Sequence, residues 1–253
     1  MKKMQTLIAM LLAGMLSIGA LAQAADKKAD GGVLVFGGSG RLGSEIIKLL
    51  VDADNSVTVF TRAGSDHSLL KGMKVSYVEG DMLNKDDVAA AFRSARFRVV
   101  IDASWGRDAG FFEKSMRNVS TYAKETGVKQ LILHNSVGAG GMERFPYAGF
   151  SEVKTETGKV MDRRPVVLDI TKAENVLVSS GVPYTVIRHA VIWDENTPAT
   201  GYAWLSEDHN VFTGITRKDL ATLTMSCLDN PKCINKIYNA ADNTLSWHRG
   251  LRP

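Results

Sequence analysis

The chain has 253 residues, of which 45% are hydrophobic and 23% are charged, and its formal net charge is +4. This length allows one large domain with a well-buried core, and no low-complexity tract or fixed-period repeat points to a disordered or repeat protein. The charge is small and the basic residues are scattered along the chain, which excludes nucleic acid as an expected partner.

The first 24 residues have the pattern of a secretory signal peptide. Lys2 and Lys3 precede an apolar run at residues 7–22, and Ala22-Gln23-Ala24 provides the small residues of a cleavage site. The alternative is an uncleaved membrane anchor, but the run is shorter than the roughly 20 residues that cross a bilayer. We expect cleavage after Ala24, export to the bacterial periplasm, and no stable membrane span in the mature chain.

After a polar linker at residues 25–32, residues 33–253 are expected to form a single domain. Apolar runs typical of buried strands alternate there with amphipathic helical stretches, which predicts a Rossmann-type doubly wound parallel sheet with helices on both faces. The predicted strands are residues 33–36, 57–60, 75–78, 98–103, 131–133, 184–187 and 237–239.

Helices are predicted between these strands from apolar residues that recur on one face. The clearest faces are Leu42, Ile46, Leu49 and Leu50; Phe112, Met116, Val119 and Ala123; and Val166, Ile170, Ala173 and Leu177, with further helices at residues 86–93 and 218–228. Residues 138–165 lack such periodicity. We expect them to form a long loop that is either a substrate lid or disordered.

A glycine-rich turn follows the first strand and opens the first helix, which is the context that a dinucleotide-binding motif requires. Its sequence is Gly37-Gly38-Ser39-Gly40-Arg41-Leu42-Gly43. Gly37 permits the tight turn, Gly40 lets the backbone approach a pyrophosphate, and Gly43 allows close packing of helix on strand. The motif predicts a dinucleotide site at the helix N-terminus.

The residue after the second strand bears on which dinucleotide is bound. A fold selective for NAD(H) usually has Asp or Glu here for the ribose 2'-hydroxyl, whereas this chain has Arg62. Arginine suits a 2'-phosphate, and Arg41 in the glycine turn offers a second positive contact. The pattern therefore favours NADP(H) over NAD(H); the alternative is that both are ordinary solvated arginines.

These segments, in this order, resemble the NmrA-like atypical members of the short-chain dehydrogenase/reductase superfamily. The resemblance rests on residues 33–43, Thr61-Arg62, Gly80-Asp81-Met82, residues 127–132 with Ser136, Ala173-Glu174, residues 180–188 and residues 217–221. It implies that Asp81 and Met82 lie near the adenine, and that Ala103, Ser104 and Ser136 border the rest of the cofactor. The family includes reductases, isomerases and non-catalytic cofactor sensors, so the fold does not settle function.

The Tyr-x-x-x-Lys pair that the superfamily uses for proton transfer is missing. Alignment on Ala173-Glu174 places Val166 at the tyrosine position and Ile170 at the lysine position. Lys172 is two residues away, on another side of the helix, and is expected to be a surface lysine.

Other side chains at the strand ends are the remaining candidates for chemistry. We select His134 and Ser136 as candidate catalytic residues and also weigh His189, because histidine titrates near neutral pH. Each histidine can equally be structural, and Ser136 can orient a ligand without performing chemistry. No metal-site spacing is visible.

Cys227 and Cys233 are the only cysteines, six residues apart around a predicted turn. In an oxidising compartment they can form a disulfide, and the alternative is two buried thiols.

Two functions remain open. The chain is an exported NADPH-dependent reductase of a small molecule, or a non-catalytic protein that uses the fold to bind a dinucleotide, another nucleotide-like ligand or an unknown protein partner. A chain exported unfolded must acquire its cofactor outside the cytoplasm.

Overall fold

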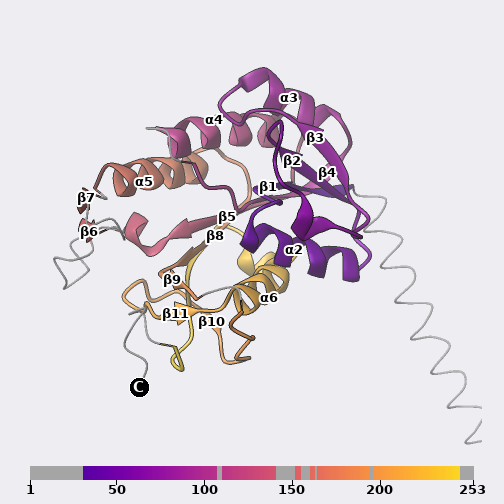
Figure 1. The fold of residues 1–253 in the computed structure, drawn as a ribbon. Coiled ribbons are helices and arrows are strands. Elements are labelled where there is room, and N and C mark those ends of the chain that lie inside the picture. The colour runs from indigo at the N-terminus through magenta and orange to yellow at the C-terminus, as the bar shows by residue number, and fades with distance from the viewer. Residues whose placement is uncertain are drawn as a thin grey trace, which may run out of the picture.

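A twisted sheet of eight strands forms the centre of the molecule (Figure 1). The computed structural model describes residues 31–106, 110–140, 152–154, 160–162, 164–193 and 196–245. The strand order is β10-β12-β8-β5-β4-β1-β2-β3, and all neighbours are parallel except β10, which runs antiparallel to β12. This is the predicted Rossmann-type arrangement, with the strand order reversing at β1 and β4.

The strands of the sheet are β1 (Gly32–Phe36), β2 (Val57–Thr61), β3 (Ser76–Glu79), β4 (Phe97–Asp102), β5 (Gln130–Ser136), β8 (Tyr184–His189), β10 (Trp204–Ser206) and β12 (Lys236–Ala241). The helices are α2 (Arg41–Asp52), α3 (Lys85–Arg93), α4 (Phe111–Glu125), α5 (Arg164–Ser179) and α6 (Arg217–Cys227).

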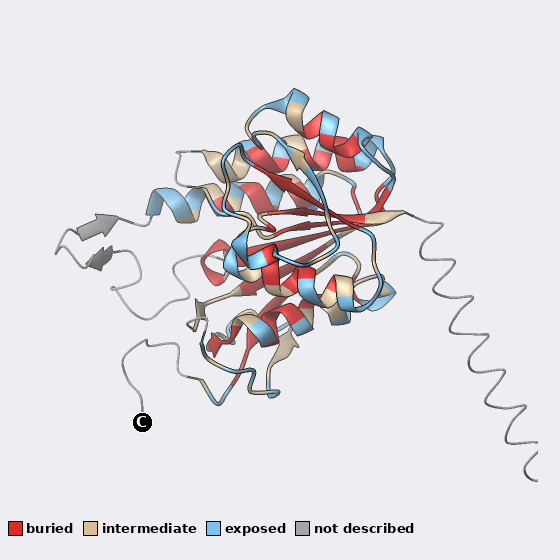
Figure 2. Ribbon diagram, turned by 45° about the vertical axis from the view of Figure 1, so that its right-hand side comes forward, coloured by how far each residue is buried: buried red, intermediate tan, exposed pale blue. Residues whose placement is uncertain are grey.

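Helices cover both faces of the sheet, as Figure 1 shows. α3, α4 and α5 pack on one face and α2 and α6 on the other, and each face has its own hydrophobic core. Consecutive residues of β1 alternate between these cores, with Leu34 and Phe36 on the α4 side and Val33 and Val35 on the α2 side. The buried side chains follow the central strands and the inner faces of the helices (Figure 2).

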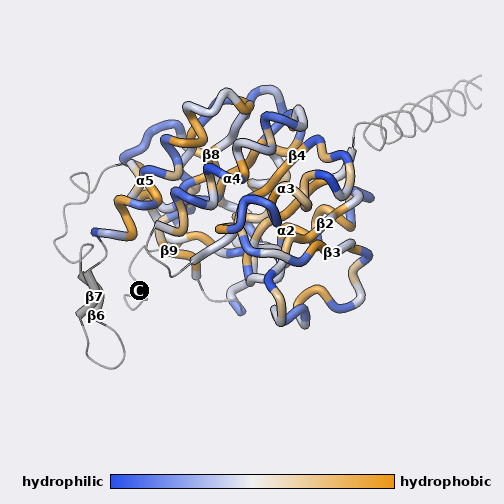
Figure 3. Tube along the Cα trace, turned by 90° about the horizontal axis from the view of Figure 1, so that it is seen from above, coloured by the Kyte–Doolittle hydropathy of each residue, from blue (hydrophilic) through white to orange (hydrophobic). Residues whose placement is uncertain are grey.

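The central strands are apolar at almost every position because both faces of the sheet are covered. The helices instead alternate hydrophobic and hydrophilic stretches, as the view from above shows (Figure 3). This contrast explains why the seven main strands and five main helices were predictable from sequence alone.

Several boundaries differ from the prediction. Gly32 belongs to β1 rather than to the linker, and β5 and β8 extend to Ser136 and His189 because their ends pair with each other. Val166 is 39% exposed, since the buried face of α5 begins only at Ile170. β10, and the short pair β9 (Val191–Ile192) and β11 (Gly214–Ile215), have no hydrophobic period long enough to reveal them.

The predicted loop at residues 138–165 contains local structure. Val137–Gly140 forms a 3-10 turn, and β6 (Glu152–Lys154) pairs with β7 (Val160–Asp162) in an antiparallel ladder. The segment is therefore not structureless throughout, although residues 141–151, 155–159 and 163 lie outside the described residues. So do the predicted signal peptide and most of the linker.

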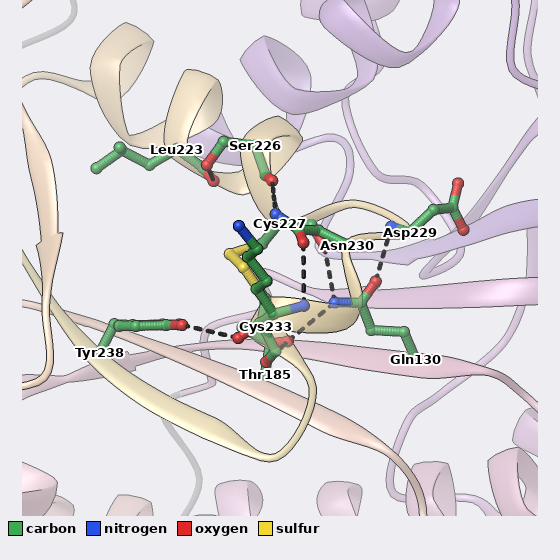
Figure 4. Close-up of a disulfide and its surroundings, with 10 residues drawn as sticks. Gln130, Thr185, Leu223, Ser226, Cys227, Asp229, Asn230, Cys233 and Tyr238 are labelled. Atoms are coloured by element: carbon green, nitrogen blue, oxygen red, sulfur yellow. Dashed lines mark hydrogen bonds between the residues drawn. A yellow bond between two sulfur atoms is a disulfide. The ribbon is translucent and has the colours of Figure 1, made fainter.

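A disulfide joins Cys227, the last residue of α6, to Cys233 in the following 3-10 turn (Figure 4). Their Cα atoms are 5.5 Å apart. The carbonyl of Cys227 accepts a hydrogen bond from Gln130 Nε2 at 2.9 Å, and that of Cys233 accepts one from Thr185 Oγ1 at 2.7 Å. Gln130 and Thr185 lie near the amino ends of β5 and β8, so the disulfide lies at the edge opposite to the carboxyl ends of these strands, where the ligand site is predicted.

Replacing both cysteines by alanine is expected to lower the free energy of unfolding by about 2 kcal/mol, the value for closing a loop of this short length. Nucleotide affinity should stay unchanged because the disulfide lies at the amino edge of the sheet. Urea denaturation of the oxidised protein, the reduced protein and the double variant checks this. Equal midpoints for all three would show that the disulfide contributes nothing.

Candidate cofactor and substrate site

The glycine turn after β1 and the segment after β4 are in direct contact at the point where the strand order reverses. A Cβ placed on Gly37 would lie 2.5 Å from the carbonyl oxygen of Ala103 and 2.6 Å from Ser104 Cα, and the φ of Gly37 is +73°. Ala103 N also donates to Phe36 O at 3.0 Å. Ligands of open α/β sheets bind in the crevice at such a point, so the predicted contacts Gly37, Ala103 and Ser104 come together there.

The glycines of the turn serve two different purposes. A Cβ on Gly43 would lie 2.3 Å from Gly37 O, and one on Gly38 would lie 2.6 Å from Ile47 Cδ1, so the fold itself requires both to be small. A Cβ on Gly40 would meet only Gly37 O, at 3.2 Å. Its φ is −77°, which any residue adopts. The fold thus restricts position 40 less than positions 38 and 43, although the turn must shift slightly to relieve this contact. A phosphate group approaching the backbone supplies a further reason for glycine there.

The start of α2 is suited to an anion. Its N-cap is Gly40, no side chain caps it, and its first turn has no acidic residue. The backbone N–H groups of that turn and the helix dipole therefore favour a negative charge. Arg41 is exposed, Ser39 and Leu42 are partly buried, and the turn as predicted thus fits the pyrophosphate of a dinucleotide.

Arg62 and the Gly80-Asp81-Met82 turn lie at the ends of neighbouring strands. Gly80 N donates to Thr61 O at 2.9 Å, which ties the two segments together. Arg62 is exposed, and its guanidinium makes no hydrogen bond or ion pair with the described part of the chain. Asp81 Oδ1 accepts from Leu83 N at 2.9 Å.

Met82 is buried, and its carbonyl accepts from Asn118 Nδ2 at 2.9 Å. The adenine end of the predicted site therefore has a fixed wall at Met82 and a solvated arginine beside it. Arg62 remains available for a 2'-phosphate.

Ser136 ends β5 at the same edge of the sheet. Its Oγ accepts from Gly138 N at 3.2 Å, which leaves the hydroxyl proton free to be donated. A bound carbonyl oxygen is a suitable acceptor. The position therefore fits a residue that orients a substrate or the cofactor.

His134 precedes Ser136 by two residues on β5, and its side chain is buried against α6. Thr224 Oγ1 donates to Leu220 O at 2.8 Å, so it must accept from His134 Nε2, 3.1 Å away. Burial, and then the neighbouring His189, lower the pKa of His134 to about 3. Burial likewise lowers the pKa of His189 to about 4.

Both imidazoles are therefore neutral near pH 7 and hold no imidazolium proton to give. This argues against the predicted role of His134 as a proton donor. Its hydrogen bond to Thr224 indicates a structural role instead.

The helix positions that the superfamily uses for proton transfer hold only apolar side chains. Ile170 is buried, and Val166 one turn earlier is partly exposed. Lys172 points elsewhere, with Nζ 3.7 Å from Glu113 Oε2, as expected of a surface lysine. Among the described residues there is also no cluster of acidic, histidine or cysteine side chains that could hold a metal ion.

Three features of this edge were not foreseen from sequence. Asp102, at the end of β4, is buried, and burial raises the pKa of its carboxyl. Trp105 is 64% exposed three residues later. Glu174 and Arg188 form a buried ion pair between α5 and β8. An acidic residue at the end of an apolar strand was a usable signal for Asp102, whereas the pairing of Glu174 with Arg188 depends on packing alone.

The sequence model of a family described as NAD(P)H-binding matches residues 37–231, which is most of the chain. The chain belongs to this NAD(P)H-binding family. The match confirms the predicted NAD(P)-binding family, and the structural likenesses show that the fold is shared. No curated protein sequence matches the chain.

Three solved structures illustrate the shared fold. ChuY from Escherichia coli O157:H7, described as an anaerobillin reductase, has 22% identity over 85% of this chain and 98% of its own, with a TM-score of 0.69. A short-chain dehydrogenase/reductase from Veillonella parvula in complex with NADP has 15% identity over 85% of this chain and 95% of its own, with a TM-score of 0.67. WbmG from Bordetella bronchiseptica, in complex with NAD and UDP, has 17% identity over 84% of this chain and 74% of its own, with a TM-score of 0.61.

The described helices were also compared with the length and hydrophobicity of a membrane span. None of them is both long and apolar enough to span a bilayer.

Proposed function

We propose that the mature chain is an exported NADPH-dependent reductase of a small organic molecule. The observation that carries the proposal is Gly40, the glycine of the turn whose added Cβ would meet the fewest atoms, at the helix start where a phosphate would approach the backbone. The NAD(P)H-binding family and reductase-like neighbours such as ChuY support oxidoreductase chemistry.

Arg62 supports NADPH rather than NADH. It is an exposed arginine at the end of β2, where the usual partner of a free ribose 2'-hydroxyl is an acidic side chain. A guanidinium binds a phosphate through paired, charge-assisted hydrogen bonds.

The proposed chemistry requires little from the chain itself. Bound NADPH supplies the hydride, and the protein holds the acceptor against it. Ser136 donates a hydrogen bond to the substrate oxygen, and water supplies the proton because Val166 and Ile170 cannot. Such a reductase suits acceptors that are easily reduced, since no side chain assists with a strong acid.

Two features support a site of action outside the cytoplasm. The first 24 residues have the features of a cleavable export signal, and the cysteines at positions 227 and 233 are paired.

Replacing Arg62 by alanine is expected to weaken NADPH binding at least tenfold, about 1.4 kcal/mol, and to leave NADH binding almost unchanged. Isothermal titration of residues 25–253 with each nucleotide measures this. Lys74→Ala is the matched control, because it removes one exposed positive charge before β3, at the amino edge of the sheet. Equal losses for NADPH and NADH would show that Arg62 does not recognise the 2'-phosphate.

A second candidate function, a non-catalytic NADP(H) sensor, is favoured by the apolar residues at both proton-transfer positions. Stoichiometric NADPH mixed with the protein and a panel of carbonyl compounds distinguishes the two. Loss of absorbance at 340 nm supports a reductase. Tight binding with no oxidation by any compound supports the sensor.

A further inference from the structure

We propose that Trp105 and Phe112 form an aromatic shelf that stacks against a flat, conjugated substrate, so that the reductase acts on planar ketones or quinones. This inference rests on the proposed function and specifies its substrate class. It rests on three observations, namely the position of Trp105, the way it is held and its exposure.

Trp105 lies directly beside the cofactor site. Its neighbour Ser104 is in van der Waals contact with Gly37, the first glycine of the phosphate turn. Consecutive Cα atoms are 3.8 Å apart, so the backbone of Trp105 lies one residue from the segment that contacts the phosphate turn. β4 pairs with β5, which brings Ser136 to the adjoining strand end.

Aromatic rings hold this segment in place. The rings of Trp105 and Phe112 meet edge to face, with centroids 5.0 Å apart and planes at 70°. Phe112 contacts Phe111 in the same way, at 5.3 Å and 87°. A Cβ on Gly106 would lie only 2.2 Å from Phe111 Cγ, so the Gly106 backbone rests on that ring.

The helix that carries these rings is anchored to α5. Asp169 accepts hydrogen bonds from Phe112 N and Glu113 N, both at 3.1 Å, through its two carboxylate oxygens. This caps the first turn of α4 from outside, because the N-cap Gly110 has no side chain to do so. The shelf is therefore fixed before any ligand arrives, which reduces the entropy lost on binding.

Trp105 is nevertheless 64% exposed. A fold gains most from an indole by burying it, and tryptophan is enriched at interfaces, where part of the ring stays in contact with a partner. The edge-to-face contact with Phe112 therefore leaves most of the Trp105 surface accessible. An open aromatic face pairs best with another flat π system, offset and parallel.

The polar partner on this edge suits the same substrate class. Ser136 donates a single neutral hydrogen bond, and the shelf residues Trp105 and Phe112 are uncharged. A planar ketone or quinone offers an aromatic face to the shelf and a carbonyl oxygen to the serine. Reduction takes one hydride from NADPH and one proton from water, and converts one carbonyl into a hydroxyl.

Two 1,2-diones that differ in flatness test the inference. The probes are 9,10-phenanthrenequinone, which is flat and aromatic, and 1,2-cyclohexanedione, which is neither. Equilibrium dialysis against the full mature protein, with and without saturating NADP+, gives their affinities. We expect the flat dione to bind at least tenfold more tightly.

Variants assign that preference to Trp105. Trp105→Ala should remove the preference for the flat dione, whereas Trp105→Phe should retain most of it. Leu69→Ala is the control, because Leu69 is another exposed apolar side chain, far along the chain from the shelf. Unaltered affinities in Trp105→Ala, or no preference in the unmodified protein, would overturn the inference.

Titration of the same variants with NADPH separates this inference from the proposed function. If the protein binds NADPH but shows no preference for the flat dione, only the inference about the aromatic shelf is refuted. If the unmodified protein does not bind NADPH, the proposed reductase function is refuted. A flat dione that still binds through Trp105 would then show that the aromatic shelf binds flat ligands nonetheless.

Discussion

Replacing Gly40 by valine is expected to reduce NADPH affinity about 100-fold, equivalent to about 2.7 kcal/mol. The new side chain would project into the space where the backbone must approach the pyrophosphate. The fold should lose less stability than at Gly43, because a Cβ at this position meets only Gly37 O at 3.2 Å, a tight contact that a small shift of the turn relieves, and the φ of −77° suits any residue. Isothermal titration gives the affinity, and thermal unfolding followed by circular dichroism gives the stability.

Gly43→Ala is the control from the same turn and should behave in the opposite way. Its Cβ would lie 2.3 Å from Gly37 O and 2.7 Å from Gly38 Cα, so overpacking should lower the free energy of unfolding by about 2–3 kcal/mol. If Gly40→Val binds NADPH as the unmodified protein does, the glycine turn is not the phosphate site. If Gly40→Val unfolds like Gly43→Ala, its loss of affinity has a structural cause.

The contrast between these glycines shows what the sequence could reveal about the fold. A buried parallel sheet imposes continuous apolar runs, and helices on its faces impose a 3.6-residue period, so both patterns appear in the chain. β10 is an edge strand of three residues paired only with β12, which leaves no pattern to detect. Val166 matches the apolar period of α5 but is exposed in the structure. The period alone does not show where along its length a helix leaves the core.

The residues of the candidate site likewise include some that the sequence predicts and some that it does not. Gly37, Gly40 and Arg62 lie at spacings that phosphate and ribose recognition dictate, so the sequence predicts them. His134 met the same criterion of position at a strand end. Side chains alternate along a strand, and the one at His134 turns into the α6 layer to meet Thr224. The aromatic shelf depends on contacts between a loop and two helices, which no local pattern encodes.

Removing one partner of the buried ion pair between Glu174 and Arg188 is expected to cost more stability than the loss of any other polar contact among the described residues. Both side chains are about 95% buried, with exposed fractions of 4% and 5%. Arg188 Nε donates to Glu174 Oε2 at 3.0 Å, and a second, shorter contact joins Arg188 Nη2 to Glu174 Oε1. Asn135 Nδ2 donates to the same Oε2 at 3.0 Å.

Glu174→Ala should therefore lower the free energy of unfolding by about 3–5 kcal/mol, because it leaves a guanidinium buried without a counter-charge. Asp52→Ala is the matched control. Asp52 pairs with Lys48 at 2.6 Å, but both side chains are more than half exposed, so its loss should leave the stability almost unchanged. Urea denaturation compares the two, and equal midpoints would show that the buried pair has no special weight.

A double replacement, Glu174→Leu with Arg188→Met, separates stability from function. Apolar side chains of similar volume should restore most of the lost stability, because no charge is left buried. They cannot restore the bond to Asn135, whose Oδ1 accepts from Ser136 N at 2.9 Å and so fixes the end of β5. Asn135 would keep only its longer bond to Ile170 O, at 3.3 Å. The double variant should fold, bind NADPH and reduce a carbonyl substrate more slowly, since Ser136 is held less firmly. If its rate equals that of the unmodified protein, the position of Ser136 does not depend on the ion pair.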